Sequence, residues 1–188
     1  VYGWGDNVYG QLGAVTEHAS EGPLRLKLPT RPGETVIALA AASFHSLALT
    51  DAGRVLGWGD NTHGQLGRNR RGFVAALLPG GVGGESGAPT EEEFEAEFTA
   101  AAAPAFLPLE LHAGEAVVAV SVGAYHSGAV TSSGRLLLWG DNTYGQLGAE
   151  ASNSSEVGES LAATPLGGVY AHARAPGEEH TLVRTNGP

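Results

Sequence analysis

Short apolar segments alternate with turn sequences along most of this chain. The segments "VIALAAA" at 36–42, "HSLALT" at 45–50 and "GRVLGWG" at 53–59 follow one another closely, and Asp51-Ala52-Gly53 separates the last two. Apolar runs of this length, bounded by turns that end in Gly, are typical of strands joined as hairpins. Residues 36–59 therefore predict three antiparallel strands.

The same succession returns at "VVAVSVG" (117–123), "HSGAVT" (126–131) and "GRLLLWG" (134–140). A fourth apolar segment belongs to each unit, "PLRLKL" at 23–28 and "PAFLPLEL" at 104–111. Four short strands that recur at a constant period are the pattern of a β-propeller blade. The predicted fold class is therefore all-β.

Two motifs fix the period of the repeat. The first reads "WGDNVYGQLG" at 4–13, "WGDNTHGQLG" at 58–67 and "WGDNTYGQLG" at 139–148, so its copies begin 54 and then 81 residues apart. The second motif gives the same two spacings in reverse order, with 81 residues from His45 to His126 and 54 from there to His180. The unit is thus 54 residues long, and the middle repeat carries 27 more. The repeat segments are 1–35, 36–116 with an insertion at about 68–103, 117–170 and 171–188.

These motifs resemble the regulator of chromosome condensation repeat, which combines Gly-x-x-His-Ser, a turn ending in Gly, and Trp-Gly-x-Asn-x-x-Gly-Gln-Leu-Gly. Ala42 departs from this pattern, because the family prefers Gly there. The resemblance implies a seven-bladed propeller, of which this chain holds about three blades. We expect an open arc, in which the strand of Trp4 is not paired with the strand after His180, because propellers have about 4–8 blades.

The repeated motif residues are expected to be structural. Gly allows left-handed turns, Asn61 can bond its own loop backbone, and the Gln65 amide can satisfy loop donors and acceptors. Trp58 and Leu66 are expected to fill the space between blades. The full structural set is Trp4, Asn7, Gln11, Leu12, His45, Trp58, Asn61, Gln65, Leu66, His126, Trp139, Asn142, Gln146, Leu147 and His180.

Composition narrows the function classes. The 188 residues contain no Cys, which excludes disulfides and thiolate chemistry, and they carry a formal net charge of −10, which argues against nucleic-acid binding. No apolar run reaches the roughly 18–20 residues of a membrane span. The chain starts at Val1 and lacks Met, so we expect it to be part of a longer protein, located inside the cell in the cytoplasm or nucleus.

Catalytic and metal-binding interpretations are weaker. A ring of His45, His126 and His180 would need ligands converging on one ion, whereas equivalent blade positions lie far apart. Neighbouring His and Ser on a strand point to opposite faces, and no nucleophile-elbow sequence is present. Asp6, Asp60 and Asp141 lack the spacing of a calcium loop. We expect no enzymatic activity and no cofactor or metal.

The insertion is the distinctive segment of the middle repeat. It contains the basic "RNRRG" at 68–72, a Gly-rich linker at 79–89, and a predicted helix at 90–103 that is capped by Thr90 and Glu93. Phe94 and Phe98 are four residues apart and share one face of that helix. The helix either packs on the propeller rim or docks a partner.

The expected function is a non-enzymatic protein–protein interaction module. The family resemblance implies three settings: a regulatory propeller of a guanine nucleotide exchange factor or ubiquitin ligase, direct nucleotide exchange on a small GTPase, or enzyme inhibition. The candidate partner-binding residues are the loop-tip Tyr9, His63 and Tyr144, with Phe94 and Phe98 of the insertion. The expected partner is a protein with a basic patch, such as a small GTPase. The alternative, that the loop-tip aromatics pack on their own loops, stays open.

Overall fold

The computed structural model describes residues 1–13, 19–67, 101–148, 162–164, 169–170 and 184–185. The described part is built from antiparallel strands, and Ala101 and Ala102 are its two helical residues. The basic segment 68–72, the linker, the capping box, Phe94, Phe98 and His180 lie outside the described residues.

Two four-stranded sheets form the centre of the molecule. The first has the order β3-β4-β5-β6, with β3 (Val36–Ala41), β4 (His45–Thr50), β5 (Val55–Gly59) and β6 (Ala105–Phe106). The second has the order β10-β9-β8-β7, with β7 (Val117–Val122), β8 (His126–Thr131), β9 (Leu136–Gly140) and β10 (Ala162–Thr164). The three predicted strands of each unit are therefore present, followed by a fourth.

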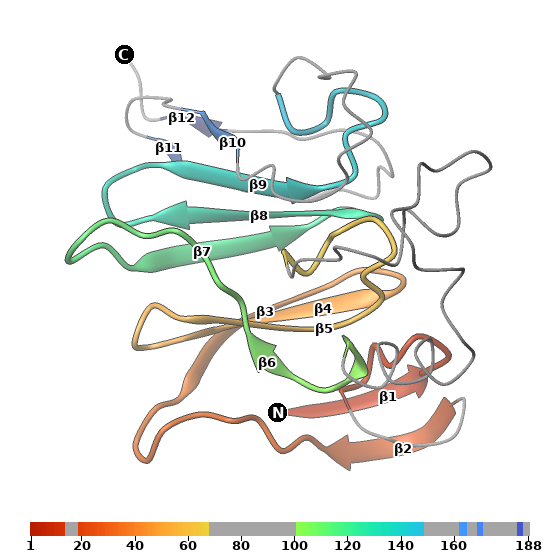
Figure 1. Ribbon diagram of the computed structural model, residues 1–188. Coiled ribbons are helices and arrows are strands. Elements are labelled where there is room, and N and C mark those ends of the chain that lie inside the picture. Colours follow the sequence, from red (N-terminus) through yellow and green to blue (C-terminus); the bar gives the residue numbers. More distant parts are fainter. Residues whose placement is uncertain (14–18, 68–100, 149–161, 165–168, 171–183, 186–188) are drawn as a thin grey trace, which may run out of the picture.

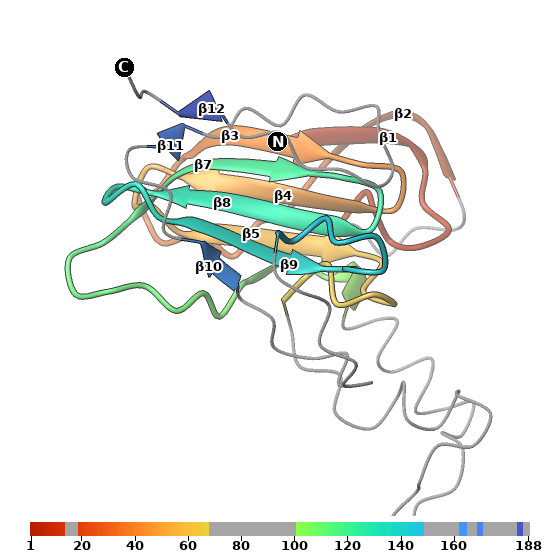
Figure 2. The same ribbon diagram turned by 90° about the horizontal axis from the view of Figure 1, so that it is seen from above.

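Two shorter sheets flank this pair. β1 (Tyr2–Asp6) pairs with β2 (Ala19–Arg25), and β11 (Val169–Tyr170) pairs with β12 (Arg184–Thr185). Figure 1 shows the sheets following one another in chain order, with β1 and β2 at one end and β11 and β12 at the other. Figure 2, seen from above, shows the sheet with β7, β8 and β9 lying over the sheet with β3, β4 and β5. Among the described strands β1 does not pair with β12, so the predicted open arc is confirmed.

The predicted bounds of the fourth strand were wrong in both units. β2 begins at Ala19 because β1 continues through Gly5 and Asp6, which pair with Ser20 and Ala19. In the middle unit the strand pairs at Ala105 and Phe106, and the Leu107 N–H adds one bond to the Val55 carbonyl at 2.9 Å. Pro108, which follows soon after, has no N–H to donate to a ladder.

The core lies between neighbouring sheets. Every residue of β4 and β5 is buried, because each of these strands is covered on both faces. One apolar cluster, including Leu47, Leu66 and Trp139, joins the two central sheets. A second cluster, including Leu26, Leu56 and Trp58, joins the sheet β3-β4-β5-β6 to the segment that contains β1 and β2. β3 instead alternates, with Ile37 and Leu39 exposed on its outer face.

Candidate functional site

The ten-residue motif folds into the same loop in each repeat. The Asn side-chain oxygen accepts a hydrogen bond from the backbone N–H of the Leu five residues later, at 2.9 Å for Asn7 and Leu12, 2.9 Å for Asn61 and Leu66, and 3.0 Å for Asn142 and Leu147. In each copy this bond closes the loop with the loop's own side chain.

The Gln of the motif links the loop tip to its base. Gln65 Oε1 accepts from the backbone N–H of His63 at 2.8 Å, and Gln65 Nε2 donates to Asp60 Oδ2 at 2.8 Å. Gln11 and Gln146 make the same pair of contacts in their own loops. The bond from Gln holds the backbone of the residue at the loop tip, which is Tyr9, His63 or Tyr144. Because its side chain takes no part in this bond, the residue type at this position can differ between repeats.

The backbone carbonyl of the same Gln joins one repeat to the next. The carbonyl oxygen of Gln65 accepts from Ser127 Oγ at 2.7 Å and from Trp139 Nε1 at 2.8 Å, both in the following repeat. One repeat earlier, the Gln11 carbonyl accepts from Ser46 Oγ and Trp58 Nε1, each at 2.9 Å. A buried Trp pairs its N–H in this way, so the two indoles fill the inter-sheet space without an unsatisfied donor.

Trp4 has a different environment from its two equivalents. Its side chain is 64% exposed, whereas Trp58 and Trp139 are each 2% exposed. Trp58 and Trp139 are covered by the motif loop one repeat earlier in the chain, and no such loop covers Trp4 among the described residues. The Trp of one repeat is therefore buried only where the motif loop of the preceding repeat covers it.

His45 crosses the same boundary between repeats. Its Nε2 lies 2.9 Å from Ser127 Oγ, and that hydroxyl donates its single proton to the Gln65 carbonyl. The network therefore assigns the proton to Nε2 of His45, which donates to the serine oxygen. Nδ1 of His45 is buried and has no partner among the described residues. Burial lowers the pKa of His45 from 6.5 to about 4, so the ring is neutral at neutral pH.

An aromatic row runs across three repeats at the end of the blades that carries the motif loops. The Tyr9 ring meets Phe44 edge-on with centroids 5.0 Å apart, Phe44 stacks on Tyr125 at 5.7 Å, and Tyr125 contacts His63 at 4.5 Å. We call these four residues the aromatic row. Tyr9 and His63 are exposed and the other two rings are half-buried. Tyr9 and His63 thus each pack on the following repeat, not only on their own loops.

Two members of the aromatic row were missed by sequence reasoning. Phe44 and Tyr125 precede His45 and His126 in the second motif, at equivalent positions, and both are aromatic. Tyr144, a predicted partner-binding residue, lies outside the row and is 66% exposed. The residue before His180, equivalent in the repeat to Phe44 and Tyr125, is Glu179 and lies outside the described residues.

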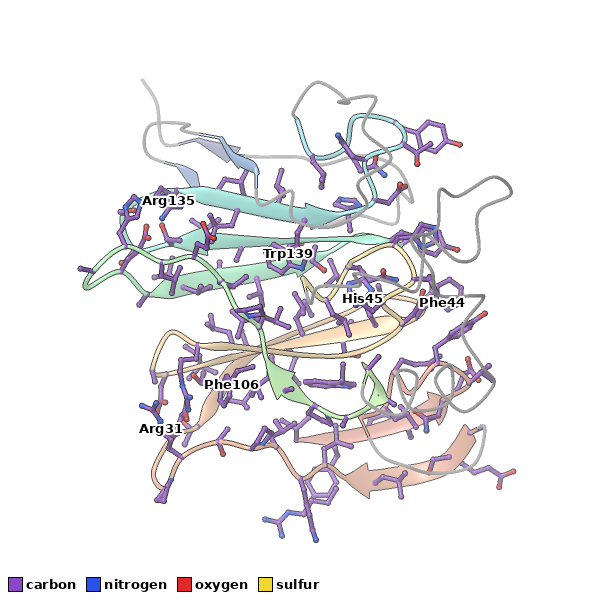
Figure 3. The ribbon with its side chains drawn as sticks, viewed as in Figure 1. Arg31, Phe44, His45, Phe106, Arg135 and Trp139 are labelled. Atoms are coloured by element: carbon purple, nitrogen blue, oxygen red, sulfur yellow. The ribbon has the colours of Figure 1, made fainter. Side chains whose placement is uncertain are left out.

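Ion pairs hold the opposite end of the blades. Arg54 binds Glu34, with Nε 3.0 Å from Oε1, and its guanidinium lies 3.7 Å from the Phe106 ring centroid. The equivalent pair 81 residues later joins Arg135 Nη1 to Glu115 Oε2 at 2.6 Å. Figure 3 shows Phe44 and His45 at one end of the strands and Arg31 and Arg135 at the other. The two ends of the blades therefore differ in chemistry, one aromatic and one held by ion pairs.

Other kinds of site receive no support from this geometry. In the part of the chain that the structure describes, no three His, Cys, Asp or Glu side chains come together in a way that could hold a metal ion. No helix within the described ranges is long and apolar enough to cross a membrane.

The antiparallel sheets, repeated along the chain and joined through one recurring loop, define a segment of a β-propeller. Models of the regulator of chromosome condensation (RCC1) repeat match residues 1–49, 36–65 and 117–146. The chain therefore belongs to the RCC1 repeat family.

Two curated proteins contain a stretch similar to this chain. Over 185 residues it is 29% identical to the serine/threonine-protein kinase Nek9 of Xenopus laevis, covering 98% of this chain and 18% of that protein. Over 171 residues it is 33% identical to RCC1 domain-containing protein 1 of Mus musculus, covering 82% of this chain and 42% of that protein. The chain thus spans less than half of either relative.

A solved structure shares the fold. Prp20p of Saccharomyces cerevisiae, reported with its binding properties to Gsp1p and histones, superimposes with a TM-score of 0.54. The match covers 80% of this chain and 31% of that one at 21% identity. At this identity the likeness shows the fold alone.

Proposed function

We propose that this chain is part of a non-enzymatic propeller that binds a protein partner at the end of the blades carrying the aromatic row. The carrying observation is the row itself, in which Tyr9, Phe44, Tyr125 and His63 form an unbroken series of ring contacts across three repeats. Partly exposed aromatic rings on a rigid framework are characteristic of the residues that dominate protein interfaces. The framework is rigid here because every motif loop closes through its own Asn and Gln.

The partner that this end favours is a protein with a basic patch. The five loops at this end, 4–13, 41–46, 58–67, 122–127 and 139–148, contain Asp6, Asp60 and Asp141 but no Lys or Arg. The whole chain has a net charge of −10, which would steer a basic partner towards it. A regulatory propeller of an exchange factor or ubiquitin ligase is the particular setting we propose, and nucleotide exchange on a small GTPase is the alternative.

The test is capture of partners by the protein carrying this chain, followed by mass spectrometry. We expect the double variant Tyr9→Ala with Phe44→Ala to lose partners that the unaltered protein retains, and the retained set to shrink as salt rises. Val118→Ala is the matched control, because Val118 is an exposed apolar residue towards the other end of β7. Identical partner sets for all three proteins would place the binding surface elsewhere.

A nucleotide-release assay distinguishes the proposed regulatory role from direct nucleotide exchange on a small GTPase. We expect the protein to leave the rate of GDP release from small GTPases unchanged, since the proposed role is binding without turnover. An increase in that rate that is lost in the double variant would favour direct exchange over a regulatory role.

A further inference from the structure

The loops that carry the aromatic row also contain Asp60 and Asp141, and they contain no Lys or Arg. The backbone N–H of Asp60 donates to the Phe44 carbonyl at 2.8 Å, and that of Asp141 donates to the Tyr125 carbonyl at 2.9 Å. Each of these carboxylates accepts hydrogen bonds from neutral groups, a Gln amide and a Thr hydroxyl. The loops that carry the rings therefore also carry the negative charge at this end of the blades.

Elsewhere in the same molecule a cation is bound by a ring and a carboxylate together. At the opposite end, Arg54 places its guanidinium 3.7 Å from the centroid of Phe106 while binding the Glu34 carboxylate. An aromatic face attracts a cation through its quadrupole, and a carboxylate receives the planar guanidinium through hydrogen bonds. The five loops at the aromatic row contain both rings and carboxylates, and they contain no Lys or Arg.

We infer that the aromatic row is a receptor for an arginine side chain presented by the protein partner. This inference rests on the proposed function and names the chemical group that the site recognises. Arginine suits the row better than lysine because its flat guanidinium stacks on a ring and is more weakly hydrated than an ammonium. Phe44 and Tyr125 are the central rings, since each contacts two other members of the row.

The experiment uses two labelled peptides of equal length and charge, one alternating Arg with Gly and one alternating Lys with Gly. Their binding to the protein is measured by fluorescence anisotropy at low salt. We expect the arginine peptide to bind about 5-fold more tightly than the lysine peptide, as one or two guanidinium–ring contacts would give.

Three variants assign the binding to the row. Phe44→Leu with Tyr125→Leu keeps apolar volume but removes two rings, and we expect it to weaken the arginine peptide about 10-fold and to erase its advantage over lysine. Tyr9→Leu changes an exposed side chain that the fold does not need, so it reports on the row even where the double variant is unstable. Tyr144→Leu is the control, because Tyr144 is equivalent to Tyr9 in the repeat but lies outside the row, and we expect less than about a 2-fold effect.

Equal binding of the two peptides, or binding that neither row variant changes, would overturn the inference. Arginine-peptide binding that appears only after Arg68, Arg70 and Arg71 are replaced by Gln would also overturn it, because the chain itself would then supply the cation. Loss of partner capture in row variants, without arginine preference, would leave the proposed function standing and remove this inference alone.

Discussion

At the scale of single residues, one ring nitrogen of His45 makes a hydrogen bond, and the other has no hydrogen-bond partner among the described residues. Nε2 donates to Ser127 across the boundary between repeats, while Nδ1 is enclosed without a partner in the described part of the chain. Protonation would place a charged group with an unsatisfied N–H in the interior. Such a group is costly to bury, and this is the physical reason for its lowered pKa.

Stability is expected to depend on pH through His45. Its folded pKa of about 4 lies below the ordinary 6.5, so the unfolded chain takes up the proton first as pH falls. Its contribution is complete above about pH 6.5 and is lost towards pH 4, by up to about 3 kcal/mol. Urea unfolding at several pH values checks this. We expect His45→Gln to be less stable than the unaltered protein at pH 7, and its stability to change less between pH 6.5 and 4.

At the scale of elements, the Glu34–Arg54 pair ties the turn before β3 to the start of β5. The Glu34 side chain is only 5% exposed, and it also accepts from the backbone N–H of Arg31. The hydrogen bond from Arg54 lowers the pKa of Glu34 to about 2. For Glu115, burial acts to raise the pKa, but hydrogen bonds led by that from Ser133, together with the charge of Arg135, lower it to about 2.

A second, more acidic stability transition follows from these two carboxylates. Because both folded pKa values lie below the ordinary 4.5, their contribution is complete above about pH 4.5 and is lost as pH falls towards 2. We expect Glu34→Gln with Glu115→Gln to lower the thermal midpoint at pH 7 and to reduce its decline between pH 4.5 and 2. Glu110→Gln, at an exposed carboxylate, is the control and should reproduce the unaltered curve. A decline of the same size in the double variant would show that other groups cause it.

Sequence patterns predicted the elements better than they predicted the contacts between them. Asn61 and Gln65 could be assigned loop roles because their partners lie within five residues. The Glu34–Arg54 pair was not predicted, although Glu115 and Arg135 repeat the same two residue types 81 positions later. The contact between Tyr9 and Phe44 could not be predicted from the sequence. The periodicity gives the position of each residue within its repeat, but not which loop of the next repeat that residue contacts.

At the scale of the whole molecule, the arc depends on close backbone approach between repeats. Gly59 has a φ of 103°, and a Cβ there would lie 2.4 Å from the Phe44 carbonyl oxygen and 3.2 Å from Gln11 Cα in the preceding repeat. Gly140 is placed in the same way against Tyr125 and Gln65. A side chain at either position would clash with the backbone of the neighbouring strand in its own repeat and would also press on the preceding repeat.

Gly59→Ala is therefore expected to destabilise the protein by about 3 kcal/mol or more, from a strained φ together with a clash against backbone atoms. Gly64→Ala is the matched control, because Gly64 also has a positive φ, 76°, but nothing lies within 4 Å of a Cβ there. It should cost about 1 kcal/mol. Both values come from urea unfolding, and equal losses for the two variants would show that backbone conformation, not the close approach of neighbouring backbone, is the limiting factor.

The bond from a Gln carbonyl to the Ser and Trp of the next repeat has a direction, and that direction sets how such a chain can grow. Each repeat brings donors for its predecessor and an acceptor for its successor, so a duplicated unit joins the series without any compensating substitution. An insertion shorter than a whole repeat has to lie outside the residues that make these hydrogen bonds between repeats. The extra residues of the middle repeat obey that rule, since they enter after Gly67, two positions beyond the acceptor carbonyl of Gln65. Tandem copying can therefore lengthen the arc while single insertions diversify it, and neither process disturbs the other.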